Sequence, residues 1–210
     1  MISMSNFNYS KPVPRKPEQP FRDGETTLGF ALVDFWRWSA SDLLNNVTRG
    51  NLAEFIVAKA LGITTEVRTV WAAYDLLMPS ERGRELKIEV KSAAYLQGWE
   101  QDKYSLIQFD VRKTKALDEA TSIYTGASKR QADVYVFALL KHQYRPTIEP
   151  LNLAQWDFYV LPTAILDREV GEGHSISLKS LEKLIAPVCF SNLRQAVGNA
   201  APLSATGEAT

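Results

Sequence analysis

The stretch Glu85–Ser92 constrains the fold most, because charged and aliphatic residues alternate along it without a break. The order is Glu85, Leu86, Lys87, Ile88, Glu89, Val90 and Lys91. A β-strand points successive side chains to opposite faces, so the pattern predicts a strand with one charged and one aliphatic face. Taken alone, the pattern favours a strand whose charged face only meets solvent.

Other segments indicate the elements around this strand. A helix is predicted over Asn51–Leu61 with Gly62 as its stop, and a closing helix over Ser177–Ile185. A loop or helix is expected from Lys113 to Gln131. The β-favouring segments are Glu66–Met78, Glu85–Ser92, Tyr104–Val111, Asp133–Leu140 and Trp156–Leu161. This order predicts an α/β (α+β) fold with a central mixed sheet of about five strands flanked by helices.

The chain of 210 residues has the length of one domain, and its two ends differ from the middle. Residues 1–27 contain Pro12, Pro14, Pro17 and Pro20 and few aliphatic residues, which favours a flexible N-terminal arm. Residues 191–210 are rich in Ala, Ser, Thr and Gly and are expected to form a flexible C-terminal tail. The folded domain is therefore predicted over residues 28–190.

Composition excludes several classes of protein. With 24 basic and 24 acidic residues, the net charge of zero excludes a polycation that coats nucleic acid by charge alone, but not a neutral protein with one basic face. One cysteine, Cys189, excludes an internal disulfide framework, and we expect it to be a buried small hydrophobe. No apolar run has the roughly 20 residues that span a bilayer, and the polar start does not resemble a signal peptide. We therefore expect a cytoplasmic protein without a membrane partner.

A hairpin at residues 79–84 gives the charged strand a sharper interpretation. If the chain folds back about Arg82, antiparallel pairing places Leu77 opposite Lys87 and Asp75 opposite Glu89. Directly opposed residues share a face with Cβ atoms about 5 Å apart. Two such carboxylates repel each other unless a cation lies between them, and oxygen ligands suit Mg²⁺ or Mn²⁺.

The same pairing separates two Glu-x-Lys triplets on this strand. Glu85 of the first triplet would face Pro79 at the turn, with no carboxylate opposite. Glu89 of the second would face Asp75, with Lys91 one pleat further along. The second triplet is therefore the better candidate site.

These residues resemble a known family. An acid on one strand, a short loop and Glu-x-Lys on the next strand are the signature of the PD-(D/E)XK, or restriction endonuclease-like, nucleases. Asp75 and Glu89–Lys91 match it, and Glu54 lies on a preceding helix that is similar to the family's acid-bearing helix. Gln97 resembles a glutamine that some branches carry after the motif. Tyr74 stands where the name-giving proline would be.

The resemblance implies a restriction endonuclease-like core and a set of roles. Mg²⁺ (or Mn²⁺) would be held by Asp75, Glu89 and the carbonyl of Val90, and Lys91 would orient or help deprotonate the attacking water. Glu54 would add a ligand through water, or is alternatively a solvent-facing helix acid. Gln97 would be an accessory catalytic residue, or is alternatively a polar turn residue.

The sequence thus favours a Mg-dependent nuclease (a phosphodiesterase) that acts on nucleic acid, DNA in first place, of restriction or repair type. Basic residues that could contact phosphates, or could simply be solvated, are Arg82, Arg84, Lys113, Lys115, Lys129 and Arg130. The alternatives are a catalytically inactive nucleic-acid-binding or assembly module with the same fold, and an unrelated α+β interaction domain. Family members often dimerise to cut both strands, which allows a homodimer.

Overall fold

The computed structural model describes residues 12–63, 67–68, 73–79, 85–118 and 123–202. Its centre is a four-stranded mixed sheet in the order β3-β4-β8-β9. The strands are β3 (Leu76–Pro79), β4 (Glu85–Ala94), β8 (Val134–Leu140) and β9 (Trp156–Pro162). β3 and β4 pair antiparallel, β4 and β8 pair parallel, and β8 and β9 pair antiparallel.

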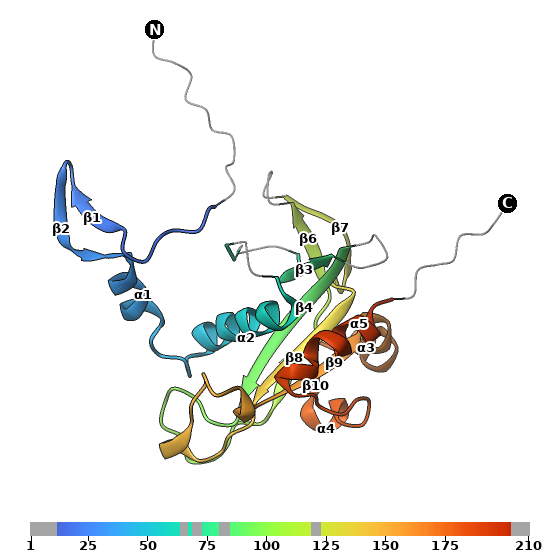
Figure 1. Cartoon of the computed structure of the whole chain (residues 1–210). Helices are drawn as coiled ribbons and strands as arrows, with labels where there is room; N and C mark the ends of the chain where they lie inside the picture. The colour runs from blue at the N-terminus through green and yellow to red at the C-terminus, as the bar shows by residue number, and fades with distance from the viewer. Residues whose placement is uncertain (1–11, 64–66, 69–72, 80–84, 119–122, 203–210) are drawn as a thin grey trace, which may run out of the picture.

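Helices and short strands cover both faces of this sheet. On one face lie α2 (Asn46–Leu61) and α5 (Leu193–Ala200), and the other face is covered by α3 (Thr163–Val170), α4 (Leu178–Leu181) and the pair β5 (Gln108–Asp110) and β10 (Ser175–Ser177). Figure 1 shows α2 beside the long strand β4. The predicted α+β class and central mixed sheet are confirmed. The sheet has four strands because the segment at 104–111 forms only β5, which pairs with β10 instead.

The alternation in β4 divides the core into two clusters. Leu86, Ile88 and Val90 are buried against α2, in a cluster that also contains Ile56 and Val57. The odd-numbered residues of β4 point to the other face, where Ala93 packs with side chains such as Phe137 and Tyr159. β8 lies between the two clusters and is buried along its whole length, as expected for a parallel central strand.

The boundaries of α2 follow from its sequence. Asn45 caps the helix by accepting a hydrogen bond from the amide of Val47 at 2.9 Å. Gly62 ends it in a left-handed conformation with φ of 76°, which glycine adopts without strain. The predicted stop at Gly62 is confirmed, and the helix begins at Asn46, earlier than the apolar spacing indicated.

Two predicted elements and one predicted burial differ from the structure. The segment Lys113–Gln131 forms a β-hairpin of β6 (Thr114–Asp118) and β7 (Ile123–Lys129) in place of a loop or helix. Only Leu178–Leu181 of the predicted closing helix is α-helical. Cys189 is exposed and not buried, because it lies in the irregular segment before α5.

The structure also places elements in the two terminal regions. β1 (Pro20–Asp23), β2 (Thr26–Ala31) and α1 (Leu32–Ala40) form a hairpin and helix that project away from the sheet (Figure 1). In the predicted tail, α5 buries Leu193 and Val197, which are four residues apart and face the core together. The packed region therefore extends to Ala200. Among the described residues, the helices are too short or too polar to cross a bilayer.

Candidate active site

The β3–β4 hairpin has the register that the sequence predicts. Leu77 pairs with Lys87, and Pro79 pairs with Glu85. The paired register ends at Leu76 and Ile88, and just before β3 the amide of Asp75 donates to the carbonyl of Ile88 at 3.0 Å. Oδ2 of Asp75 then accepts a hydrogen bond of 2.7 Å from the amide of Val90. Asp75 is thus held at the edge of β4, next to Glu89.

Burial and neighbouring charge raise the pKa of Asp75 to about 7. The largest cause is desolvation of the carboxylate, followed by the negative charges of Glu89 and Glu54. The hydrogen bond from Val90 and the positive charge of Lys91 oppose the rise and do not cancel it. Asp75 therefore titrates close to neutral pH, and its ionised form is favoured by any cation placed against it.

Glu89 and Lys91 form an ion pair on the face of β4 that points away from α2. Nζ of Lys91 lies 2.5 Å from Oε1 of Glu89, and both side chains are mostly buried. Burial lowers the pKa of Lys91, but the carboxylates of Glu89, Asp75 and Asp110 outweigh burial and raise it. Lys91 is therefore protonated at neutral pH and brings a fixed positive charge to the site.

Glu54 lies on α2 and is engaged by Arg68. Nε and one terminal nitrogen of Arg68 reach the two oxygens of Glu54, at 2.5 and 2.8 Å. α2 packs on the aliphatic face of β4. Glu54 therefore approaches the sheet from the opposite face to Glu89 and Lys91. Among the described residues, no three Asp, Glu, His or Cys side chains cluster closely enough to hold a metal by themselves. The negative charge of Glu54 nevertheless raises the pKa of Asp75.

A cavity of about 570 Å³ opens between α2 and the β3 edge. Its lining includes Glu54, Arg68 and Asp75 together with apolar residues such as Phe55 and Met78. Asp75 therefore lines this cavity and also neighbours Glu89 on the charged face.

Gln97 belongs to a buried structural network and not to the carboxylate site. Its Oε1 accepts from Arg49 at 2.9 Å, and its Nε2 donates to the carbonyl of Ala94 and to Ser105. Arg49 is buried as well, donates to Ser92 Oγ at 3.2 Å, and has a pKa lowered by burial. Through Arg49, the network joins α2 to Gln97 in the loop after β4 and to Ser92, the residue that follows Lys91.

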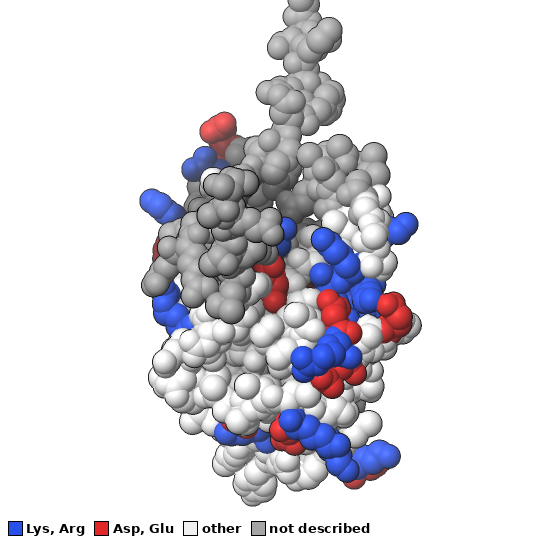
Figure 2. Space-filling model, turned by 90° about the vertical axis from the view of Figure 1, so that its right-hand side faces the viewer, with Lys and Arg blue, Asp and Glu red and all other residues white. Residues whose placement is uncertain are grey.

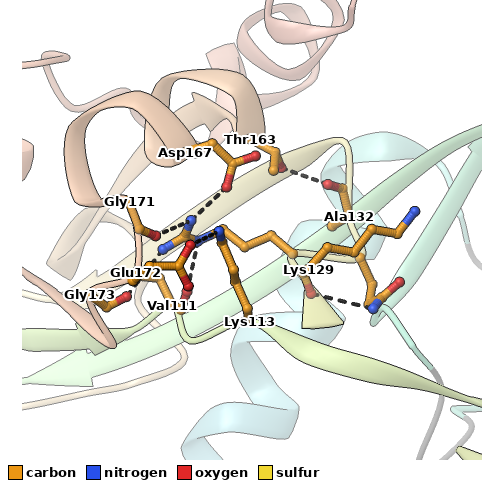
Figure 3. Close-up of polar contacts among 11 residues, drawn as sticks. Val111, Lys113, Lys129, Ala132, Thr163, Asp167, Gly171, Glu172 and Gly173 are labelled. Atoms are coloured by element: carbon orange, nitrogen blue, oxygen red, sulfur yellow. Dashed lines mark hydrogen bonds and ion pairs between the residues drawn. The ribbon is translucent and has the colours of Figure 1, made fainter. Parts of the chain in front are cut away.

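Arg130 is a buried clamp, which corrects its prediction as a phosphate-contacting residue. Its guanidinium donates to the carbonyls of Val111, Gly171 and Gly173 and to Oδ1 of Asp167 at 2.6 Å. Figure 3 shows these acceptors converging from three segments of the chain. The Arg130 side chain has no exposed surface, so its guanidinium is not placed to contact a ligand.

The other predicted basic residues have different positions. Lys113 lies 2.5 Å from Glu172 in an ion pair, whereas Lys115 and Lys129 are exposed on the β6–β7 hairpin. Arg82 and Arg84 lie outside the described residues. Figure 2 shows basic and acidic side chains interspersed on one face of the molecule, without a continuous basic surface in the described part.

Two residues near the site escaped the sequence reasoning. Tyr135 on β8 pairs with Glu89 in the parallel register, and burial together with the charge of Glu89 raises its pKa. Asp110 on β5 is close enough to Lys91 for their charges to interact, and it forms an ion pair with Arg112 at 2.8 Å. The uniformly apolar pattern of residues 134–140 gave no signal for Tyr135, because every residue of that strand is buried.

Comparison with known proteins identifies the class of the chain. A family model described as "Bacteriophage T4 endonuclease IV" matches residues 30–179, and this span includes the β3–β4 hairpin and the carboxylates on it. The match places the chain in the class of endonucleases. The chain belongs to the bacteriophage T4 endonuclease IV family.

Among solved structures, a bacterial homing endonuclease, I-Ssp6803I, is similar to 61% of this chain and 74% of its own, with 21% identity and a TM-score of 0.35. No curated protein matches the chain.

Proposed function

We propose that the protein is a metal-dependent endonuclease of the PD-(D/E)XK superfamily that hydrolyses phosphodiester bonds in DNA. The observation that carries the proposal is the bond from the Val90 amide to Asp75, which holds this carboxylate within charge interaction of Glu89, while Glu89 is paired with Lys91. Membership of an endonuclease family independently supports the nuclease part of the proposal. The Glu85-x-Lys87 triplet lacks this arrangement, since Glu85 faces Pro79 and is exposed.

The donor set fits a hard divalent cation. Asp75, Glu89 and the carbonyl of Val90 would hold Mg²⁺ or Mn²⁺, and these oxygens are the ligands such ions prefer. Mg²⁺ is commonly bound by one or two carboxylates, with water and substrate phosphate completing its shell. The fit is supported by the repulsion that Glu89 exerts on Asp75, which a cation would relieve. Glu54 would contribute through water, from the side of α2.

The bound metal would act as a Lewis acid toward the phosphate and lower the pKa of a bound water. The chain's own residues do the rest. Lys91, protonated because of its acidic neighbours, offsets negative charge that develops on the phosphate and orients the attacking water by donating to it. Val90 keeps Asp75 in place through its amide, and Glu89 keeps Lys91 in place through the ion pair. Gln97 supports this arrangement only indirectly, through Arg49 and Ser92.

The substrate proposal is DNA because the family is one of endonucleases and the site needs a phosphodiester. Lys115 and Lys129 are exposed and free to approach a phosphate backbone, whereas Lys113 would first have to leave Glu172. A cytoplasmic location and a homodimer belong to the same proposal. The exposed thiol of Cys189 suits a reducing compartment.

DNA cleavage by purified protein tests the proposal. Wild-type protein should nick or cut plasmid and single-stranded DNA with Mg²⁺ or Mn²⁺ and stop when EDTA is added, while an RNA of the same sequence tests the choice of substrate. Lys91→Ala should lose the activity, whereas Lys87→Ala, the lysine of the other triplet, should keep it. Equal loss in both variants would contradict the assignment. DNA binding by wild-type protein without cleavage would favour an inactive binding module.

A further inference from the structure

The region formed by β1, β2 and α1, Pro20–Ala40, is here called the aromatic arm. Five of its aromatic side chains are substantially exposed, with Trp38 at 85%. The exposed aromatics are Phe21, Phe30, Phe35, Trp36 and Trp38. α1 has no buried residue, and its main neighbour among the described elements is β2. Soluble monomers rarely leave so many large apolar side chains together in solvent.

An arm of this size does not hold its shape by itself. An isolated two-stranded hairpin is marginally stable in water, and helices shorter than about 12–15 residues are marginal as well. The aromatic arm consists of one such hairpin and a helix of nine residues. A surface that packs against the exposed aromatics would supply the missing stability.

The charge of the aromatic arm favours protein over nucleic acid as the partner. It carries Arg22 and Arg37 against Asp23, Glu25 and Asp34, so two positive charges face three negative ones. A nucleic-acid-binding arm needs an excess of positive charge to neutralise phosphates. The aromatic residues are therefore available for a protein surface.

A matching surface exists on the same chain. An apolar groove of about 200 Å³ lies between α2 and the segment after β8, lined by Leu52, Phe55, Ile56, Leu151, Leu153 and Phe190. It is smaller than the roughly 300–1,000 Å³ of pockets for drug-sized ligands and suits a single large side chain. Lys59 is the charged residue of the lining, and its sign is opposite to the net charge of the arm. Leu151 at its rim is 64% exposed.

The linker between α1 and α2 keeps the aromatic arm away from its own groove. Asp42 accepts hydrogen bonds from the amides of Leu44 and Asn45, and Arg49 donates to the carbonyl of Leu44 at 3.0 Å. These bonds fix the linker, and α1 projects away from the body beyond the start of α2 (Figure 1). Residues from the later part of α2 line the groove, so an arm that fills it has to come from another copy of the chain.

We propose that two copies of the chain exchange aromatic arms, each docking α1, with Trp38 foremost, into the apolar groove of the other. The exchange is reciprocal, so it closes as a dimer and leaves neither surface exposed. Aromatic side chains bury about 150–250 Å² each, so the exposed fraction of five offers about 500 Å² per arm. Burial of all this aromatic surface on both arms, against equal areas of the groove and of the surface around it, would come to about 2,000 Å², the upper end of the standard range for stable complexes. The proposal does not depend on the nuclease assignment.

Sedimentation of the full chain tests the exchange with two matched pairs of variants. Wild-type protein should be a dimer, and Trp38→Ser and Leu151→Arg should each weaken dimerisation by at least about tenfold. Trp99→Ser and Leu106→Arg alter exposed residues of the same kinds outside the arm and groove, and should leave the dimer unchanged. A wild-type monomer up to about 100 µM, a ladder of larger oligomers, or equal effects of the control variants would each overturn the proposal.

Crosslinking distinguishes exchange from other dimers. Cys189 adjoins Phe190 of the groove and is the protein's one thiol, so Ser39→Cys adds a second thiol on the arm. A flexible bismaleimide should link two chains in Ser39→Cys protein and should fail when Cys189→Ser is added. Links within one chain would show that the arm folds onto its own groove. Links between chains that survive Cys189→Ser would show that the arms meet each other, and either result contradicts exchange.

Discussion

The amide of Val90 donates a 2.7 Å hydrogen bond to Oδ2 of Asp75, and this bond ties the proposed metal ligand to the strand that carries Glu89 and Lys91. A backbone donor does not depend on the side chain at position 90, so the contact depends on the position of Asp75 at the end of β3 and not on the residue type at position 90. The bond lowers the pKa of Asp75, but burial and the charges of Glu89 and Glu54 raise it more. The site therefore holds a carboxyl group that is ready to exchange a proton for a cation.

The raised pKa of Asp75 predicts how stability depends on pH. The folded value is about 7 and the ordinary value is 3.8, so between them the folded state holds a proton that the unfolded state has lost. The contribution of Asp75 to the free energy of unfolding therefore falls as pH rises from about 4 to about 7. Asp75→Asn cannot titrate, so the difference between wild type and variant should change by up to about 1.4 kcal/mol per pH unit in this window.

Urea unfolding of metal-free protein at a series of pH values measures this difference. The stability of the variant relative to wild type should increase as pH rises, because in this window only the wild type gains an ionised carboxylate on unfolding. A difference that stays constant from about pH 4 to about pH 7 would show that Asp75 is not desolvated in the folded protein.

Metal binding should show the complementary dependence on pH. Carboxylate ligands bind a cation only when deprotonated, so millimolar Mg²⁺ or Mn²⁺ should raise the melting temperature more at about pH 8 than at about pH 5.5. Asp75→Asn should lose most of the effect, whereas Glu85→Gln, which changes the acid of the other triplet, should retain it. A rise of equal size in Asp75→Asn would place the metal elsewhere.

Glu54 is predicted to act on Asp75 through its charge. Its negative charge contributes to the raised pKa of Asp75, after burial and Glu89. Glu54→Gln removes that charge, so Asp75 should ionise at a lower pH and the metal-induced rise in melting temperature should begin at a lower pH. Arg68→Gln is the informative comparison, because it removes the partner of Glu54 and leaves the acid in place. An unchanged or higher onset in Glu54→Gln would contradict this electrostatic role.

The local geometry of the hairpin was predictable from sequence, because one short loop sets it. Once the turn is centred near Arg82, the pairs Leu77–Lys87 and Pro79–Glu85 follow by counting, and the structure has both. Gly62 is similar, since a left-handed position at the end of a helix favours glycine. In both cases the deciding interactions lie within a few residues.

Residues whose partners are distant in sequence were not predictable in this way. Arg130 was assigned to a basic surface by its neighbours, but its partners Val111, Asp167 and Gly171 come from other segments. Gln97 was matched to a motif, but its side chain binds Arg49, which is 48 positions away. The charge pattern of residues 111–131 did not indicate a β-hairpin, because that hairpin depends on register and not on charge.

Gln97 should behave as a structural residue and not as a catalytic one. Gln97→Ala removes one of the acceptors of the buried Arg49 guanidinium and leaves part of its donor capacity unpaired, so the free energy of unfolding should fall by about 1–3 kcal/mol. Well below the melting temperature, cleavage per folded molecule should remain within a few-fold of wild type, unlike the loss in Lys91→Ala. Gln101→Ala tests the neighbouring, less buried amide. Full stability combined with lost cleavage would return Gln97 to the catalytic set.

Arg130 and Lys129 are adjacent, but substitutions at the two positions should have opposite effects: loss of stability at Arg130 and loss of DNA binding at Lys129. Arg130→Met removes the donors to three carbonyls and to Asp167, so unfolding should cost about 3–5 kcal/mol less than in wild type. Lys129→Met changes an exposed side chain, and stability should stay within about 0.5 kcal/mol. If the β6–β7 hairpin contacts DNA, Lys129→Met should weaken binding and reduce its salt dependence, while folded Arg130→Met should bind as wild type does. A stable Arg130→Met variant with weakened DNA binding would mean that the guanidinium reaches the nucleic acid after all.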